Sequence, residues 1–134
     1  MTSIFSKIIR GEISGYKIAE NDDFFAFLDI RPIAKGHTLV VPKKETDYIF
    51  DIDDNELGRM MIFAKKIAIA IKEAIPCTRV GVAVMGLEVP HAHIHLIPIN
   101  KEADMYFCNP KLNLTPEEFE TIAQNIRLTV NDEQ

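Results

Sequence analysis

The sequence predicts an α+β domain in which two main helices cover an antiparallel sheet of about five strands. Short apolar segments alternate with turn residues, and two longer segments have helical spacing behind clear capping residues. The third observation is length, because a chain of 134 residues is usually one domain and can bury a core without disulfides or metals. We therefore expect residues 1–134 to form a single domain.

The first third of the chain predicts a short helical turn followed by three strands. Residues 4–10 mix apolar and basic side chains and favour the helical turn. The run Asn21-Asp22-Asp23 is a turn signal of the kind that joins two strands of a hairpin. Pro42 cannot donate to a sheet ladder, so it ends the third strand. The three strands are expected at residues 16–20, 24–28 and 36–42.

The two main helices are predicted from capping residues and apolar spacing. Asp53 can cap the first helix, and Glu56 stands three residues later, as in a capping box. Pro76 ends that region, and Thr115 with Glu118 opens the second helix in the same way. The apolar positions that recur at helical spacing are Leu57, Met60, Met61, Ala64, Ile67, Ala68 and Ile71, then Phe119, Ile122, Ala123 and Ile126.

Two further strands are expected at residues 79–85 and 91–98, before a polar stretch from residue 100 to residue 114. The second of these strands contains three of the four histidines in the chain. Successive side chains of a strand point to opposite faces, so the histidines share one face and the apolar residues share the other. The histidine face holds His91, His93 and His95, and the apolar face holds Ala92, Ile94 and Leu96.

Several imidazoles on one face predict a functional site, because clustered titratable groups mark such sites. The residues alone leave two kinds of chemistry open. Neutral imidazoles can bind a catalytic zinc ion, although the run contains no HExxH pattern and no carboxylate. Alternatively, the central imidazole can attack a phosphorus atom as a nucleophile while its neighbours orient it and donate to phosphate oxygens.

Composition and charge narrow the classes of partner. The formal net charge is −5, which argues against broad binding to a nucleic acid backbone. No apolar run is long enough to span a bilayer, and the N-terminal residues do not look like a secretion signal. Cys77 and Cys108 have no motif spacing and are expected to be reduced thiols. We therefore expect a cytoplasmic protein with no membrane or nucleic acid partner.

The histidine run resembles the signature of the histidine triad (HIT) family, in which three histidines alternate with apolar residues. Residues 4–13, 26–32 and 36–44 are similar to segments of the branch that contains nucleoside phosphoramidases, in the same order. The resemblance covers about residues 4–98, and residues 99–134 are expected to form a C-terminal extension with a helix, of which residues 105–134 have no counterpart that we could align. It implies a HIT-like fold and a homodimer.

The resemblance also implies a reaction. In this family the middle histidine attacks the α-phosphorus of a nucleotide derivative, forms a covalent nucleotidyl-histidine, and water then releases the nucleoside monophosphate. His93 matches that nucleophile, His91 and His95 flank it, and His37 matches a fourth family histidine. The expected substrate is a purine phosphoramidate or dinucleoside polyphosphate, and no cofactor or metal is expected.

Further residues match the family's nucleotide-binding positions. Asp29 matches the acidic residue that holds the ribose hydroxyls, a task suited to a carboxylate because it accepts from two hydroxyls at once. A turn aspartate ahead of Pro32 is the structural alternative. The remaining nucleotide-binding candidates are four residues that match the walls of the base pocket and two in the loop before the triad: Phe5, Ile8, Phe27, Ile30, Gly86 and Glu88.

Two departures from the family pattern bear on activity and metal content. Leu87 stands where the family has a glutamine that donates to phosphate, and the loop before the triad is short. This departure supports an alternative function, a nucleotide-binding module with weak or no catalysis. Ser3 and Ser6 stand where many bacterial members have Cys-x-x-Cys, which argues against a structural zinc ion.

Overall fold

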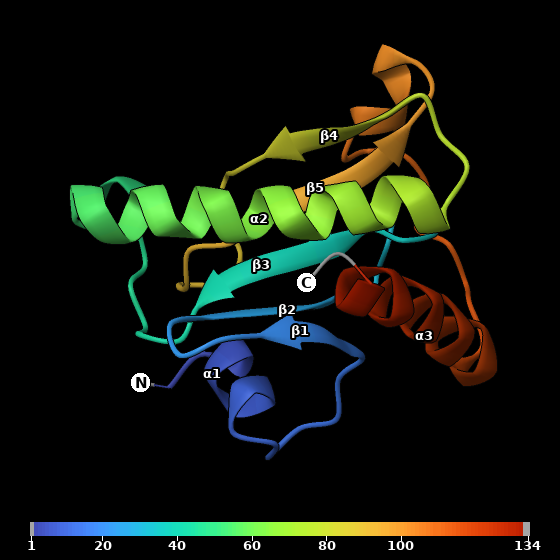
Figure 1. Cartoon of the computed structure of the whole chain (residues 1–134). Coiled ribbons are helices and arrows are strands. Elements are labelled where there is room, and N and C mark those ends of the chain that lie inside the picture. The colour runs from blue at the N-terminus through green and yellow to red at the C-terminus, as the bar shows by residue number, and fades with distance from the viewer. Residues whose placement is uncertain (1, 133–134) are drawn as a thin grey trace.

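The computed structural model of the protein describes residues 2–132 (Figure 1). Its sheet has five strands in the order β1-β2-β3-β5-β4, and every neighbouring pair is antiparallel. The predicted α+β class and the five-stranded antiparallel sheet are therefore confirmed. The strands are β1 (Lys17–Glu20), β2 (Phe24–Leu28), β3 (Thr38–Pro42), β4 (Arg79–Ala83) and β5 (Ile94–Ile99).

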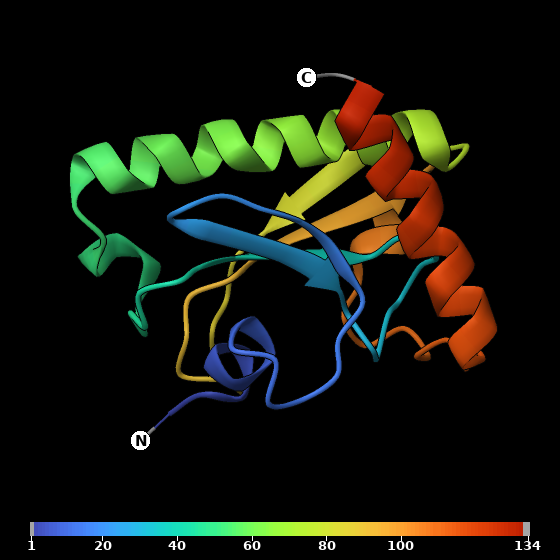
Figure 2. The same ribbon diagram turned by 60° about the horizontal axis from the view of Figure 1, so that its bottom comes forward.

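In the described part of the chain, three α-helices accompany the sheet, namely α1 (Ile4–Ile9), α2 (Asp54–Ala74) and α3 (Pro116–Asp132). Figure 2 shows α2 along one face of the sheet and α1 on the opposite face. The two 3₁₀ turns η1 (Ile49–Asp51) and η2 (Glu102–Met105) were not predicted. Within residues 2–132, none of the helices has the length and apolar character needed to cross a bilayer.

The capping residues predicted for the two long helices are confirmed. The Asp53 carboxylate accepts from the Glu56 backbone N–H at 3.0 Å and so satisfies a free donor at the start of α2. At the start of α3 the Thr115 hydroxyl accepts from the Glu118 N–H, and the Glu118 carboxylate accepts from the Thr115 N–H. This reciprocal pair is a capping box, which fixes where the helix begins.

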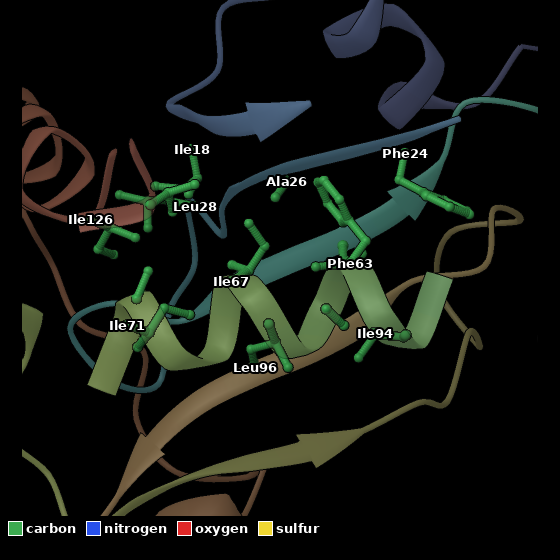
Figure 3. Packing of buried hydrophobic residues seen from close by; sticks show 14 of the residues in the cluster. Ile18, Phe24, Ala26, Leu28, Phe63, Ile67, Ile71, Ile94, Leu96 and Ile126 are labelled. Carbon is green, nitrogen blue, oxygen red and sulfur yellow. The ribbon is translucent and has the colours of Figure 1, made fainter. Parts of the chain in front are cut away.

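The main core lies between the sheet and helices α2 and α3. Figure 3 shows Ile67 and Ile71 of α2 directed toward side chains of the strands, including Ile94 and Leu96 of β5. A second, smaller cluster lies on the other face, where Phe5 of α1 covers side chains of β2 and β3. Both faces of β2 and β3 are thus buried. The histidines lie on the same face of the sheet as the smaller cluster.

The predicted strand at residues 91–98 is wrong at its start, because β5 begins only at Ile94. The ladder with β3 ends at the pair Val40–Ile94, and the preceding residues bond instead to the loop that follows β3. The Ala92 N–H, for example, donates to the Thr46 carbonyl at 2.7 Å. The predicted alternation nevertheless holds, since Ala92, Ile94 and Leu96 are all in the main core.

Two other predicted strands are also too long. The strand expected from residue 36 begins at Thr38, because Gly36 has φ +90°, a conformation that is not extended. The strand expected at 79–85 ends at Ala83, which pairs with His95, the second residue of β5.

Candidate functional site

The four histidines lie close to one another on the face of the sheet that carries α1. His95 is in β5 and pairs with Leu39 of β3, which belongs to the smaller cluster around Phe5. His91 and His93 directly precede β5, and His37 directly precedes β3. All four side chains are buried, so this part of the sheet is a compact group of imidazoles packed against α1.

The His91 ring uses both of its nitrogens inside the protein. Its Nε2 lies 2.7 Å from the Pro42 carbonyl oxygen, which can only accept, so Nε2 carries the proton. Its Nδ1 lies 2.6 Å from the Ser3 hydroxyl and therefore accepts from it. Burial lowers the pKa of His91, which keeps the ring neutral near pH 7. His91 is therefore held in one tautomer and cannot offer a free nitrogen to a substrate.

The His93 ring has the opposite arrangement. Its Nδ1 lies 2.8 Å from the His91 carbonyl oxygen and must donate to it. In the neutral ring, the proton on Nδ1 leaves a lone pair on Nε2. That Nε2 has no hydrogen-bond partner within residues 2–132, and it is not a buried atom, so it faces solvent. An unprotonated imidazole nitrogen open to solvent is the feature that a histidine nucleophile requires.

His37 and His95 form a hydrogen-bonded pair. The Ile33 N–H donates to Nδ1 of His37, so the proton of this ring is on Nε2. Nε2 of His37 then donates to Nδ1 of His95 at 2.9 Å, which leaves the proton of His95 on its own Nε2. This second N–H is accessible and can donate to a phosphate oxygen.

Burial keeps this pair neutral. It lowers the pKa of His37 to about 4 and that of His95 to about 3. The Asp29 carboxylate opposes the shift in His37, since its Oδ2 lies 3.5 Å from Nε2 of that ring. The other Asp29 oxygen accepts from the Arg31 N–H at 2.9 Å, as in the turn that the structural alternative predicts. Asp29 therefore lies beside the histidines and also stabilises a turn.

Aromatic side chains enclose the histidines from two sides. The Phe5 ring meets His93 edge-on at 5.0 Å between centroids and also contacts Phe27 at 5.4 Å. From the other side, Phe107 meets His95 at 4.8 Å. Phe5 and Phe27 belong to the smaller hydrophobic cluster, and Ile8 packs against it. Sequence reasoning did not identify Phe107, because it lies in the segment expected to be polar.

Three residues of the expected nucleotide site are not brought to the histidines by any contact in residues 2–132. Ile30 is 62% exposed, and Glu88 is also exposed with no hydrogen bond. Gly86 has φ +72° and forms part of the turn before the triad, with the Asp47 carbonyl as the nearest atom to its missing side chain. Leu87, which replaces the family's glutamine, is 91% exposed. The loop between β4 and β5 therefore contributes no phosphate donor from these side chains.

The triad histidines do not converge as metal ligands, since both His91 nitrogens are already bonded. Within residues 2–132, the one group of three histidine, cysteine or acidic residues with converging ligand atoms is Asp29, His37 and His95, whose atoms lie within 4.8 Å. Binding at Nε2 of His37 moves its proton to Nδ1, opposite the Ile33 N–H. Two donors then face each other, which disfavours a metal there.

The protein has a row of buried histidines on an antiparallel sheet, with a carboxylate and aromatic rings beside them. These features define a class of α+β protein with an accessible imidazole nitrogen in its site. A profile described as "HIT domain" matches residues 10–102. The chain belongs to the HIT family. The predicted family is therefore confirmed.

Relatives of this family match nearly the whole chain. A HIT-like protein of Borreliella burgdorferi is 36% identical over 135 residues, covering 95% of this chain and 97% of the relative. The adenosine 5'-monophosphoramidase hnt1 of Schizosaccharomyces pombe is 33% identical over 128 residues, covering 94% of this chain and 96% of the relative.

A solved HIT-like protein of Bartonella henselae superposes with a TM-score of 0.82 and 34% identity over 96% of each chain. Such coverage extends past residue 102, so most of the C-terminal segment has a counterpart in these proteins. The expectation that it has none is wrong.

Proposed function

We propose that this protein is a nucleotide hydrolase that acts at the α-phosphorus of a purine nucleotide derivative, with His93 as the nucleophile. The observation that carries the proposal is the hydrogen bond from Nδ1 of His93 to the His91 carbonyl oxygen, since it leaves Nε2 unprotonated and facing solvent. The name of the Schizosaccharomyces pombe relative supports adenosine phosphoramidates as the first substrates to test.

The reaction has two displacements at phosphorus. Nε2 of His93 forms a bond to the α-phosphorus, and the bond between phosphorus and the leaving group breaks. The leaving group departs with that electron pair and takes up a proton. Water then attacks the phosphorus, the N–P bond breaks, and the ring recovers its lone pair as the nucleoside monophosphate leaves. The accessible N–H of His95 is suited to stabilise the phosphoryl oxygens in both steps.

The nucleoside part of the substrate has candidate partners on the same face. Asp29 is proposed to accept from the two ribose hydroxyls, because its Oδ2 lies beside the histidine pair. Phe5, Ile8 and Phe27 offer apolar surface against which a flat base can pack. We also propose that a bound nucleotide contacts Ile30, Gly86 and Glu88, which do not contact the histidines in the described residues. Dinucleoside polyphosphates are the second substrate class, distinguished only by the leaving group.

The direct test compares the native protein with His93→Asn on adenosine 5'-phosphoramidate, with AMP release as the readout. The asparagine variant is expected to lose at least about 10³-fold in kcat. Calorimetry with AMP serves as the control and is expected to give similar affinity for both proteins. Full turnover by the variant contradicts the proposal. Normal AMP binding by a native protein that forms no product favours the alternative function instead.

That alternative, a nucleotide-binding module with weak catalysis, is favoured by one specific observation. Leu87 is exposed and cannot donate a hydrogen bond where the family has a glutamine donor. Loss of one donor to a transition-state oxyanion lowers kcat by roughly 10²-fold or more. The variant Leu87→Gln is therefore expected to raise kcat of the native protein, with little change in AMP affinity.

We also propose that the protein is a homodimer joined through β4 and α2. In the described part of the chain β4 pairs only with β5, so its outer edge has free backbone groups. Beside it lies an apolar hollow of about 420 Å³ lined by Met61 and Ile62 of α2 and Val82 of β4. These three side chains are 47–60% exposed. A second copy of this face supplies both a strand for the edge and apolar surface for the hollow.

Light scattering tests the dimer. The native protein is expected to have twice the mass of one chain at micromolar concentration, and Val82→Lys is expected to give monomers because it places a charge in the interface. The control is Leu128→Lys, an exposed position on α3. A monomeric native protein overturns this part of the proposal. We further propose a cytoplasmic location, which fits the free thiols of Cys77 and Cys108.

A further inference from the structure

The turn that begins α1 is bonded directly to the histidine row. The Ser3 hydroxyl lies 2.6 Å from Nδ1 of His91, although the two residues are 88 positions apart in the sequence. Both side chains are buried, with exposed fractions of 5% and 0%. Phe5 of the same turn also contacts the rings of His91 and His93. The start of the chain therefore packs against the residues that precede β5.

The Ser3 hydroxyl can contribute only one proton, and its other contacts show where that proton goes. The Ser6 N–H donates to the Ser3 oxygen at 3.0 Å, so the oxygen acts as an acceptor there and caps α1. Nδ1 of His91 must accept, because the proton of that ring donates to the Pro42 carbonyl. The Ser3 hydroxyl proton therefore points to His91, with the more distant Ser6 hydroxyl at 3.3 Å as a weaker partner.

A carboxylate holds this serine in position. Oε1 of Glu45 accepts from the Ser3 N–H at 2.5 Å and from the Ser6 hydroxyl at 2.8 Å. These bonds, the one to the Ser3 backbone above all, lower the pKa of Glu45 to about 2, so it remains charged at all ordinary pH values. Glu45 lies in the loop after β3, and the last residue of that strand, Pro42, bonds through its carbonyl to Nε2 of His91. The end of β3 and the N-terminal turn thus each bond to one nitrogen of the His91 ring.

We infer that Ser3 is a positioning residue for the nucleophile, acting through His91. The Ser3 hydroxyl fixes the tautomer and place of the His91 ring. The backbone carbonyl of His91 in turn accepts from Nδ1 of His93, which leaves Nε2 of His93 as the unprotonated nitrogen. Ser3 is thus inferred to act through its bond to His91 and not by contact with the substrate. This inference rests on the proposed role of His93.

Removal of the Ser3 hydroxyl is expected to have effects on catalysis that would not follow if Ser3 only stabilised the fold. Nδ1 of His91 loses a donor that favours the neutral ring, so this ring is more easily protonated or changes tautomer. A change of tautomer breaks the hydrogen bond from Nε2 of His91 to the Pro42 carbonyl. The His91 backbone carbonyl, which accepts from His93, is then expected to shift. We expect kcat to fall by about tenfold and KM to change less than about twofold. The acid limb of the kcat–pH profile is expected to move to higher pH.

The experiment compares Ser3→Ala with Ser6→Ala on the full chain. Both variants remove one hydroxyl that bonds within this turn, but only Ser3 bonds to His91. Ser6→Ala is expected to lower Tm and to leave the acid limb of the profile in place. Ser3→Thr retains a hydroxyl and is expected to recover most of the kcat that Ser3→Ala loses.

A second measurement does not depend on activity. The ¹⁵N chemical shifts of the imidazole nitrogens report the tautomer of each ring, and the native His91 is expected to carry its proton on Nε2. In Ser3→Ala this signature is expected to change, while Ser6→Ala retains it. If Ser3→Ala retains the native His91 signature and pH profile, the inference is overturned. If His93→Asn turns over normally, it is the proposed function that has failed.

Discussion

Nε2 of His37 lies 2.9 Å from Nδ1 of His95, and the direction of this hydrogen bond is set by the Ile33 N–H on the far side of the His37 ring. This direction also fixes the tautomer of His95. Nδ1 of His95 accepts a hydrogen bond from His37, so the proton of the neutral His95 ring is on Nε2. A backbone amide in the loop before β3 thus determines which nitrogen of His95 carries the accessible proton, the group proposed to donate to the phosphate.

This relationship predicts different results for two variants of His37. His37→Ala removes the donor to His95, which frees the His95 proton to move to Nδ1, and kcat is expected to fall by about 10²-fold. His37→Gln offers an amide N–H in a similar place and is expected to lose less than about tenfold. Steady-state kinetics on adenosine 5'-phosphoramidate measure both. Equal losses in the two variants contradict the assigned direction of the bond.

The same pair predicts how stability depends on pH. Burial gives His37 and His95 folded-state pKa values of about 4 and about 3, against an ordinary value of 6.5. As the pH falls below 6.5, the unfolded chain binds protons that the folded chain does not bind. The contribution of this pair to the stability of the fold is therefore complete above pH 6.5 and decreases as the pH falls toward 4.

We expect the free energy of unfolding to fall by on the order of 4 kcal/mol between pH 7.5 and pH 5, with about 2 kcal/mol from each imidazole. Denaturant titrations at the two pH values measure this change. His37→Gln has one fewer buried imidazole and is expected to show a smaller decrease. Glu45 loses its charge well below this window, since its pKa is about 2. A protein that becomes more stable at pH 5 contradicts the neutral state assigned to the pair.

The proposed ribose contact of Asp29 predicts a loss that depends on the sugar. Asp29→Asn retains an oxygen that can accept from the Arg31 N–H, so the turn is expected to remain. A hydrogen bond to a charged group contributes about 1.5–3 kcal/mol, so AMP affinity is expected to fall roughly tenfold or more. The control ligand is 2',3'-dideoxy-AMP, whose affinity is expected to be similar for both proteins. Equal weakening toward both ligands contradicts the ribose contact.

The main core predicts a contrast within α3. Ile126 is fully buried among side chains of the sheet and α2, whereas Leu128 on the same helix is 52% exposed. Ile126→Ala is expected to lower the free energy of unfolding by about 2–5 kcal/mol, and Leu128→Ala by less than about 0.5 kcal/mol. Urea unfolding measures both. A similar cost at the two positions shows that α3 is not packed as described.

Local sequence signals predicted the parts of the fold that depend on local physics. Asp53 and Thr115 marked the starts of α2 and α3, because an N-cap needs only a side-chain oxygen and an amide three residues away. The alternation of Ala92, Ile94 and Leu96 predicted the buried face of the histidine strand, because side-chain direction has a period of two.

The errors arise where distant segments decide the outcome. The start of β5 depends on whether β3 or the loop after it offers hydrogen bonds, and the Thr46 carbonyl takes the Ala92 N–H instead of a strand partner. The bonds of Ser3 to His91 and Glu45 join residues 88 and 42 positions apart. No local pattern encodes such contacts. Phe107 was overlooked for the same reason, since its partners His37 and His95 lie in other elements.

The most direct test of the central claim is the covalent state of His93 during turnover. We expect acid-sensitive, base-stable adenylate on this residue when the protein is mixed with adenosine 5'-phosphoramidate and quenched within one turnover. Mass spectrometry of the quenched protein is expected to locate the added AMP on the peptide that contains His93, and to find none in His93→Asn. Turnover by the native protein with no adduct, or with an adduct on another residue, contradicts the account.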